Sequence, residues 1–338
     1  MGTLQVKLGR PACAMLAVSA LIGCREKPSE RTPTPPSPTQ ASSAYDATAL
    51  RAFEIWERTK DRDDAEAQRL FRDACDRGSQ LGCAGLGTTL LSGGTGLTSD
   101  PARGVQLLAT ACDARVARAC VSLAKAYEDG LGVERDRVKA AELSRGACDA
   151  GEQRGCVQYG RSMLFGDNGV SRDPQRARDL ATKACESSIA TGCTLAGLAY
   201  SSAFADAPES QKWLRRGCDG GDGAGCAALA YQYFNGGLPG EAKGVEISPK
   251  LGAEFATRAC DLGEQRGCAL LARAFANGDG VAQDIARARE LAATACNAAD
   301  AAGCSIAAKI ATAEGKTADA ATFLERSCAL GNAAACKR

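Results

Sequence analysis

The sequence predicts an all-α solenoid of about eight helix pairs, and three observations lead to this prediction. Two cysteines with seven residues between them recur eight times, and successive pairs begin about 36 residues apart. Glycine-bearing turns separate short segments that have helical periodicity. Aromatic residues make up only 5% of the 338 residues, which suits a thin helical array better than a wide core. The pairs are Cys75 with Cys83, Cys112 with Cys120, Cys148 with Cys156, Cys185 with Cys193, Cys218 with Cys226, Cys260 with Cys268, Cys296 with Cys304 and Cys328 with Cys336.

The beginning of the chain has the charge order of a secretory signal. Lys7 and Arg10 precede an apolar run, Ala12 to Ile22, which is too short to span a bilayer as a mature helix. The run ends in Leu21-Ile22-Gly23-Cys24, which resembles the lipobox of bacterial lipoproteins, where the cysteine is acylated after cleavage. We therefore expect a signal peptide at 1–23 and a lipid on Cys24. The alternative is an ordinary signal peptide with a chance cysteine.

The next segment predicts a tether and a location. Residues 24–44 include five prolines among serines and threonines, a composition that favours an extended chain over packed structure. Arg25 stands where enterobacterial lipoproteins of the inner membrane commonly have aspartate, so this resemblance favours the outer membrane, facing the periplasm. A secreted form without the lipid is the alternative location.

The solenoid is expected to occupy residues 45–338 and to begin with a helix pair of its own. The segment Asp46 to Cys75 carries Phe53, Trp56 and Phe71 at positions that could cover the open N-terminal end of the array.

The cysteine pairs are predicted to be disulfides. Sixteen cysteines remain once Cys13 and Cys24 are set aside, and an even number in an exported chain favours bridges. Two residues eight apart on one helix would lie about 12 Å apart, and a disulfide tolerates roughly 7 Å between Cα atoms. The chain must therefore turn within each pair, so that each bridge joins the end of one helix to the start of the next. A zinc site is not expected, because the chain has no histidine and no Cys-x2-Cys.

The sequence pattern of each unit between bridges predicts two short helices on either side of a glycine turn. In the unit from Cys120 to Cys148, Leu123, Ala124 and Tyr127 fall on one helix face. Small residues at the Ala124 position should let the two helices approach closely. They are Gly87, Ala124, Gly160, Gly197, Ala230, Ala272 and Ala308. Aspartates placed as N-caps of the second helices are Asp100, Asp136, Asp173 and Asp284.

This unit resembles the Sel-one-like repeat, a relative of the tetratricopeptide repeat, and the added cysteines make it similar to the Helicobacter cysteine-rich proteins. The residues that carry the resemblance include Gly130-Leu131-Gly132-Val133 with Asp136, and Gly278-Asp279-Gly280-Val281 with Asp284. The resemblance covers about residues 45–338 and implies a right-handed α/α solenoid whose first helices line a concave, partner-binding surface. Three places depart from the pattern, namely Ala203 to Ser210, Asn235 to Pro249 and Glu314 to Ala318.

One variable column on the first helices is our candidate ligand-binding surface. Its polar members form a mostly basic ladder able to meet an acidic or extended partner, although a solvated helix face would look the same. The candidate residues are Lys125, Arg161, Tyr231, Arg273 and Lys309. The insertion from Asn235 to Pro249 could reach over this groove, or it could be a tolerated surface loop.

An enzymatic alternative rests on Ser122 and Lys125. They match the Ser-x-x-Lys of serine enzymes that act on β-lactams, an activity assigned to some cysteine-rich relatives. The other motifs of that chemistry are incomplete, because Asp167-Asn168 follows Gly166 and Lys316-Thr317 precedes Ala318. The absence of histidine excludes Ser-His-Asp and Cys-His catalysis.

The overall charge gives no argument for nucleic acid, because 41 lysines and arginines balance 40 acidic residues. We expect no cofactor. The sequence thus favours an envelope-anchored scaffold that binds a protein or peptide, held to a membrane through Cys24. The alternative is a β-lactamase or penicillin-binding activity on β-lactams or peptidoglycan peptides.

Overall fold

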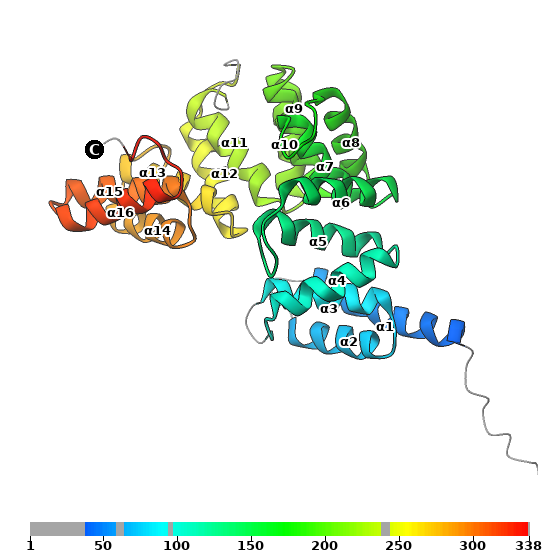
Figure 1. Cartoon of the computed structure of the whole chain (residues 1–338). Coiled ribbons are helices and arrows are strands. Elements are labelled where there is room, and N and C mark those ends of the chain that lie inside the picture. Colours follow the sequence, from blue (N-terminus) through cyan, green and yellow to red (C-terminus); the bar gives the residue numbers. More distant parts are fainter. Residues whose placement is uncertain (1–37, 59–63, 94–96, 238–243, 337–338) are drawn as a thin grey trace, which may run out of the picture.

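The chain folds into a curved array of paired helices. The computed structural model describes residues 38–58, 64–93, 97–237 and 244–336, and in these ranges it contains sixteen α-helices and no strand (Figure 1). None of these helices combines the length and apolar character that crossing a bilayer requires. The predicted signal peptide and Cys24 lie outside the described residues. The array is the predicted right-handed α/α solenoid.

Odd-numbered helices are the first helices of their pairs, here called A helices, and even-numbered helices are the B helices. From α2 onward every helix spans 13 residues. The bounds are α1 Pro38–Arg58, α2 Asp64–Asp76, α3 Gln80–Ser92, α4 Pro101–Asp113, α5 Ala117–Asp129, α6 Arg137–Asp149, α7 Gln153–Phe165, α8 Pro174–Glu186, α9 Ala190–Ser202, α10 Ala207–Asp219, α11 Gly223–Asn235, α12 Pro249–Asp261, α13 Gln265–Asn277, α14 Ile285–Asn297, α15 Ala301–Ala313 and α16 Thr317–Ala329.

The first pair, α1 and α2, covers the N-terminal end of the array as predicted. Phe53 and Phe71 are buried and meet edge to face with ring centres 4.6 Å apart, and Arg118 of α5 lies over the Phe53 ring. Helix α1 begins at Pro38, inside the 24–44 range assigned to the tether. A proline in the first turn is compatible with this start, because its missing N–H has no partner within the helix.

The eight cysteine pairs lie at disulfide geometry in the predicted pairing, with Cα atoms 4.4 to 4.9 Å apart. The turn within each pair needs one left-handed residue, such as Gly151 with φ +89° or Gly263 with φ +81°. The bridges are Cys75 with Cys83, Cys112 with Cys120, Cys148 with Cys156, Cys185 with Cys193, Cys218 with Cys226, Cys260 with Cys268, Cys296 with Cys304 and Cys328 with Cys336.

Seven bridges join the last turn of a B helix to the first turn of the next A helix, and Cys336 of the eighth follows α16. Most of the cysteines on the A helices are buried, so these sulfurs serve the packing between units and are not exposed as a reactive or ligand-binding surface. The buried A-helix cysteines are Cys83, Cys156, Cys193, Cys226, Cys268 and Cys304. The bridges therefore connect consecutive helix pairs covalently, from within the array.

Capping and small residues set the packing inside each pair. The four predicted N-cap aspartates each accept a hydrogen bond from the backbone N–H three residues on, as Asp136 does from Lys139 at 2.9 Å. At Gly87 a Cβ would lie 2.7 Å from the side chain of Leu108 and 2.9 Å from a carbonyl oxygen of α4. Close approach of A and B helices therefore depends on the small residues predicted for it.

All three irregular places are described in the structure at least in part, and two of them show how the chain adapts. The short turn between α9 and α10 lacks the glycine pair, and Ala205 there takes a φ of +51°. In the insertion after α11, the backbone N–H groups of Gly244 and Val245 donate to the carbonyl oxygen of Gly236, and the Val245 side chain is buried. Residues 238–243 of the insertion lie outside the described residues, so its reach over the groove stays a prediction.

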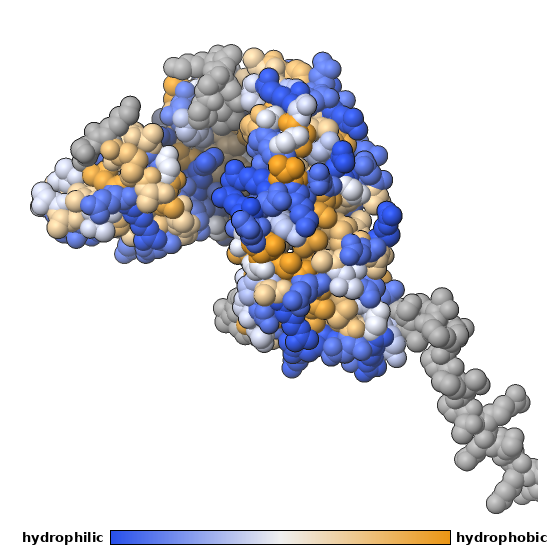
Figure 2. All heavy atoms as spheres, viewed as in Figure 1, coloured by the Kyte–Doolittle hydropathy of each residue, from blue (hydrophilic) through white to orange (hydrophobic). Residues whose placement is uncertain are grey.

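The pairs stack from α1–α4 through α5–α10 and then bend toward α13–α16, which gives the molecule the outline of a hook (Figure 1). Figure 2 shows the surface hollowed between the lobe of α13–α16 and the column of α5–α10.

Candidate functional site

A cavity of about 630 Å³ opens on the concave side of the hook. Its walls come from five successive A helices, from α7 to α15, together with the residue that precedes α13. No B helix contributes to it. The resemblance predicted that first helices line the concave surface, and the cavity has this arrangement. The lining residues are Phe165, Thr194, Leu198, Ser202, Ala224, Ala227, Ala228, Tyr231, Glu264, Arg266, Ala269, Leu270, Arg273, Ala302 and Ile306.

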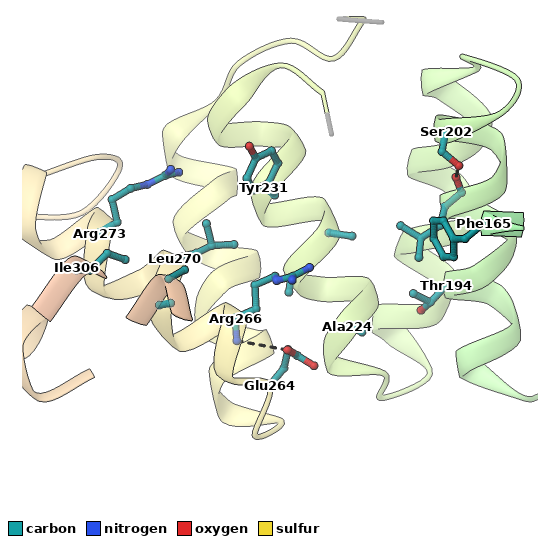
Figure 3. Close-up of a pocket in the computed structure, with 15 residues that line it drawn as sticks. Phe165, Thr194, Ser202, Ala224, Tyr231, Glu264, Arg266, Leu270, Arg273 and Ile306 are labelled. Carbon is teal, nitrogen blue, oxygen red and sulfur yellow. Dashed lines mark hydrogen bonds between the residues drawn. The ribbon is translucent and has the colours of Figure 1, made fainter. Parts of the chain in front are cut away.

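Small side chains on α11 create the space. Ala224, Ala227 and Ala228 line the cavity from this helix, and Figure 3 shows Ala224 between Phe165 and Thr194 on one side and Leu270 and Ile306 on the other. The repeat position of Ala228 is filled by Leu270 in α13 and by Ile306 in α15. An alanine at this one position therefore leaves a hollow where neighbouring units have aliphatic side chains.

The apolar part of the cavity is partly open to solvent. Phe165, at the end of α7, keeps 54% of its surface exposed although it is a large apolar residue. Leu198, Leu270 and Ile306 complete the apolar walls. An exposed aromatic ring beside aliphatic walls is typical of a surface that binds a ligand.

The charged groups of the cavity gather at α13. Arg266 and Arg273 both belong to this helix, and Figure 3 shows their side chains on the same side of the cavity as Leu270. Glu264 precedes the helix and accepts a hydrogen bond from the Arg266 backbone N–H at 3.3 Å. The hydroxyl of Thr194, on the α9 side, is buried and has no hydrogen-bond partner in the described part of the chain.

The structure brings together two of the five predicted ligand-binding residues. Tyr231 and Arg273 line the cavity, and Lys309 borders a separate hollow of about 330 Å³. Lys125 pairs with Asp129 of its own helix at 3.0 Å.

Arg161, the remaining member of the column, forms an ion pair with Glu128 of α5. This surface ion pair and that of Lys125 therefore give two of the predicted basic residues a carboxylate partner within the chain. The basic column is thus divided between an ion-paired part on α5 and α7 and a cavity-lining part on α11 and α13.

Sequence reasoning missed Arg266, Phe165 and Thr194. Arg266 lies in the segment Gly-Glu-Gln-Arg-Gly, which also occurs around Arg154, so the segment itself cannot distinguish a cavity residue from a surface residue. The usable signal was elsewhere, in the run of small residues Gly223-Ala-Gly-Cys-Ala-Ala228 on the preceding A helix.

The residues of the enzymatic alternative have separate partners. The Ser122 hydroxyl accepts a hydrogen bond from the Thr88 hydroxyl at 2.9 Å, and the Lys125 ammonium donates to Asp129. Neither residue lines the cavity. No observation favours hydrolysis of β-lactams by this pair.

Comparison with known proteins places the repeat units in one family. The Sel1 repeat model matches residues 59–79, 80–115, 117–152, 154–188, 193–222, 223–264 and 265–300, which is more than half of the chain. No curated protein is significantly similar to the chain in sequence.

Solved structures share the fold. A Sel1 repeat protein from Oxalobacter formigenes is 20% identical, over 89% of this chain and 88% of that one, with a TM-score of 0.51. A protective antigen of uropathogenic Escherichia coli is 20% identical over 86% and 70% of the two chains, with a TM-score of 0.42. Cysteine-rich protein B of Helicobacter pylori is 23% identical over 49% and 93%, with a TM-score of 0.28. The first of these likenesses shows the fold.

Proposed function

The chain belongs to the Sel1 repeat family, and from this premise we propose that it is a scaffold that binds a protein or peptide partner through its concave face. The observation that carries the proposal is the cavity to which five successive A helices contribute. A surface assembled from several stacked units is the kind that repeat proteins use for extended partners.

The chemistry of the cavity supports a peptide ligand. Its lining is mostly alanine, leucine and isoleucine with a few polar groups, the mixture that holds an apolar side chain and orients a backbone. The half-buried Tyr231 supplies an aromatic body with a hydroxyl, a residue type enriched where proteins bind one another.

A cavity-filling variant tests the proposal. Peptides selected for binding to the purified, oxidised protein from a random display library should lose roughly tenfold or more in affinity for Ala228→Trp, because the indole occupies the cavity. The fold should tolerate the change, since the same repeat position holds Gln158 in α7 and Leu270 in α13.

Ala286→Trp is the matched control, because Ala286 is exposed on the B helix α14 and lies outside the cavity. Binding to this variant should equal that of the unmodified protein, with thermal melting of both variants checked by circular dichroism. Selected peptides that bind Ala228→Trp as tightly as the unmodified protein would contradict the proposal.

We also propose that the scaffold is anchored in a bacterial envelope through a lipid on Cys24. Eight disulfides support export, because such bridges persist in oxidising compartments. Metabolic labelling with an alkyne fatty acid should mark the full chain and fail to mark Cys24→Ala, and the labelled protein should fractionate with membranes. Unlabelled protein in the culture medium would instead support the secreted form.

A further inference from the structure

Two guanidinium groups of the cavity lack a carboxylate partner among the described residues. The Arg273 guanidinium carbon lies 5.1 Å from the centre of the Phe234 ring, a contact with an aromatic face. The exposed side chain of Arg266 makes no ion pair within the described ranges. By contrast, Arg161 at the same repeat position as Arg273 is bound to Glu128.

The cavity has more positive than negative charge. Two arginines and one glutamate line it, and Glu264 already accepts a hydrogen bond at the N-terminus of α13. A ligand that brings carboxylates would supply the partners that both arginines lack. A ligand that brings lysines would place like charges together.

The two arginines frame an apolar position. Arg266, Leu270 and Arg273 are spaced i, i+4 and i+7 on α13, so they share one helix face over about 10.5 Å. The alanines of α11 lie next to this stripe, and the exposed Phe165 lies across the cavity from it (Figure 3). Along α13 this stripe therefore presents a positive charge, then an apolar side chain, then a second positive charge.

We propose that the cavity selects an extended segment of a partner protein in which an apolar side chain lies between two acidic ones. This inference rests on the proposed function and names the chemistry of its ligand. In an extended chain residues i, i+2 and i+4 share one face over about 13 Å, which long arginine side chains can match. Arginine binds carboxylates with two parallel hydrogen bonds, so both ends of the segment would be held in register.

Three matched peptides test the inference by fluorescence anisotropy with the full, oxidised protein. They share the core Ser-Leu-Ser and differ only in the flanking pair, which is Glu, Gln or Lys. The Glu peptide should bind about tenfold more tightly than the Gln peptide, and the Lys peptide should bind most weakly.

Variants of α13 test whether its two arginines cause the preference for the Glu peptide. Arg266→Gln and Arg273→Gln should each weaken binding of the Glu peptide about fivefold and leave the Gln peptide unchanged. Arg154→Gln is the control, because Arg154 is exposed in the same Gly-Glu-Gln-Arg-Gly segment and lies outside the cavity. Circular dichroism should show unchanged folding for all three variants.

The outcomes separate this inference from the proposed function. Equal affinity for the Glu and Gln peptides overturns the acidic preference, and so does tighter binding of the Lys peptide. If none of the three peptides binds, the ligand chemistry is wrong, and the peptides selected from the random library decide on the proposed function independently. A neutral selected peptide that is lost with Ala228→Trp would uphold the proposed function and overturn this inference.

Discussion

Arg161 and Arg273 occupy the same place in their repeats, five residues after the second cysteine of a bridge, yet they meet different partners. Arg161 on α7 pairs with Glu128 of α5, whereas Arg273 on α13 lies over the Phe234 ring of α11. Glu128 and Phe234 also share a repeat position, eight residues after their own bridge cysteines. One substitution in the preceding A helix thus decides whether a cation is neutralised or stays available for a ligand.

The two regions differ in space as well as in charge. Beside Arg273 the alanines of α11 line a cavity, whereas Arg161 does not line this cavity. The repeat thus supplies a uniform frame, and side chains from the neighbouring unit determine where a cavity forms on it.

The largest effect is expected from removing a bridge in each region. Replacing both cysteines of Cys218–Cys226 by serine should lower the free energy of unfolding by roughly 2–4 kcal/mol, and the same change at Cys148–Cys156 should cost a similar amount. Urea unfolding measures both. Because Cys226 lies on α11, only the first variant should also weaken binding of the Glu peptide. Equal losses of binding would mean that the bridges act on the whole array.

The next effect comes from making the second region resemble the first. Phe234→Glu places a carboxylate beside Arg273, as Glu128 is beside Arg161, and should weaken binding of the Glu peptide about tenfold. Phe234→Leu is the control, since it removes the ring without adding a charge and should change affinity by less than about threefold. Titration calorimetry distinguishes them. Unchanged binding to the glutamate variant would remove Arg273 from the site.

A smaller effect is expected from the converse change. Glu128→Gln releases Arg161 from its ion pair, but Arg161 does not line the cavity beside Arg273, and a single exposed cation holds a carboxylate weakly. Affinity for the Glu peptide should therefore rise by less than about twofold. A gain as large as the loss in Phe234→Glu would show that charge alone creates the site.

The smallest effect concerns another carboxylate that is paired as Glu128 is. The side chains of Arg289 and Lys316 hydrogen-bond to Glu314 and lower its pKa below the ordinary value. A carboxylate with a lowered folded-state pKa stabilises the fold at higher pH, and this contribution is lost as the pH falls through that pKa. Titration by nuclear magnetic resonance should find the lowered pKa, and Glu314→Gln should lessen the acid destabilisation of α14–α16. An ordinary pKa would contradict this reading.

Much of the fold follows from local sequence signals. These signals are the bridge spacing, the capping aspartates such as Asp136 and the small residues such as Gly87. Each involves residues close together in the sequence, so about one repeat is enough to recognise it. The position of Tyr231 and Arg273 on the concave side was instead implied by the resemblance to related solenoids, whose first helices line that surface.

The composition of the site could not be derived in this way. Lys125 and Arg161 fit the column as well as Arg273 does, and only the fold shows that Asp129 and Glu128 bind them. Arg266 has the same local segment as Arg154, and its place in a cavity depends on α11, about forty residues earlier in the chain. Contacts between neighbouring units depend on pairs of residues that are far apart in the sequence. A single sequence does not show which residues form these pairs.

The spacing of the bridges has a consequence for how the chain matures. Each cysteine pairs with the one eight positions away, so the loop to be closed is short and its closure needs no other unit. A pair can oxidise as soon as its own turn has formed, before the next unit has been synthesised or translocated. Sixteen cysteines therefore reach one disulfide pattern among very many, because each pair forms independently between nearby residues. For the same reason the molecule can lengthen by whole units during evolution without any existing cysteine having to change its partner.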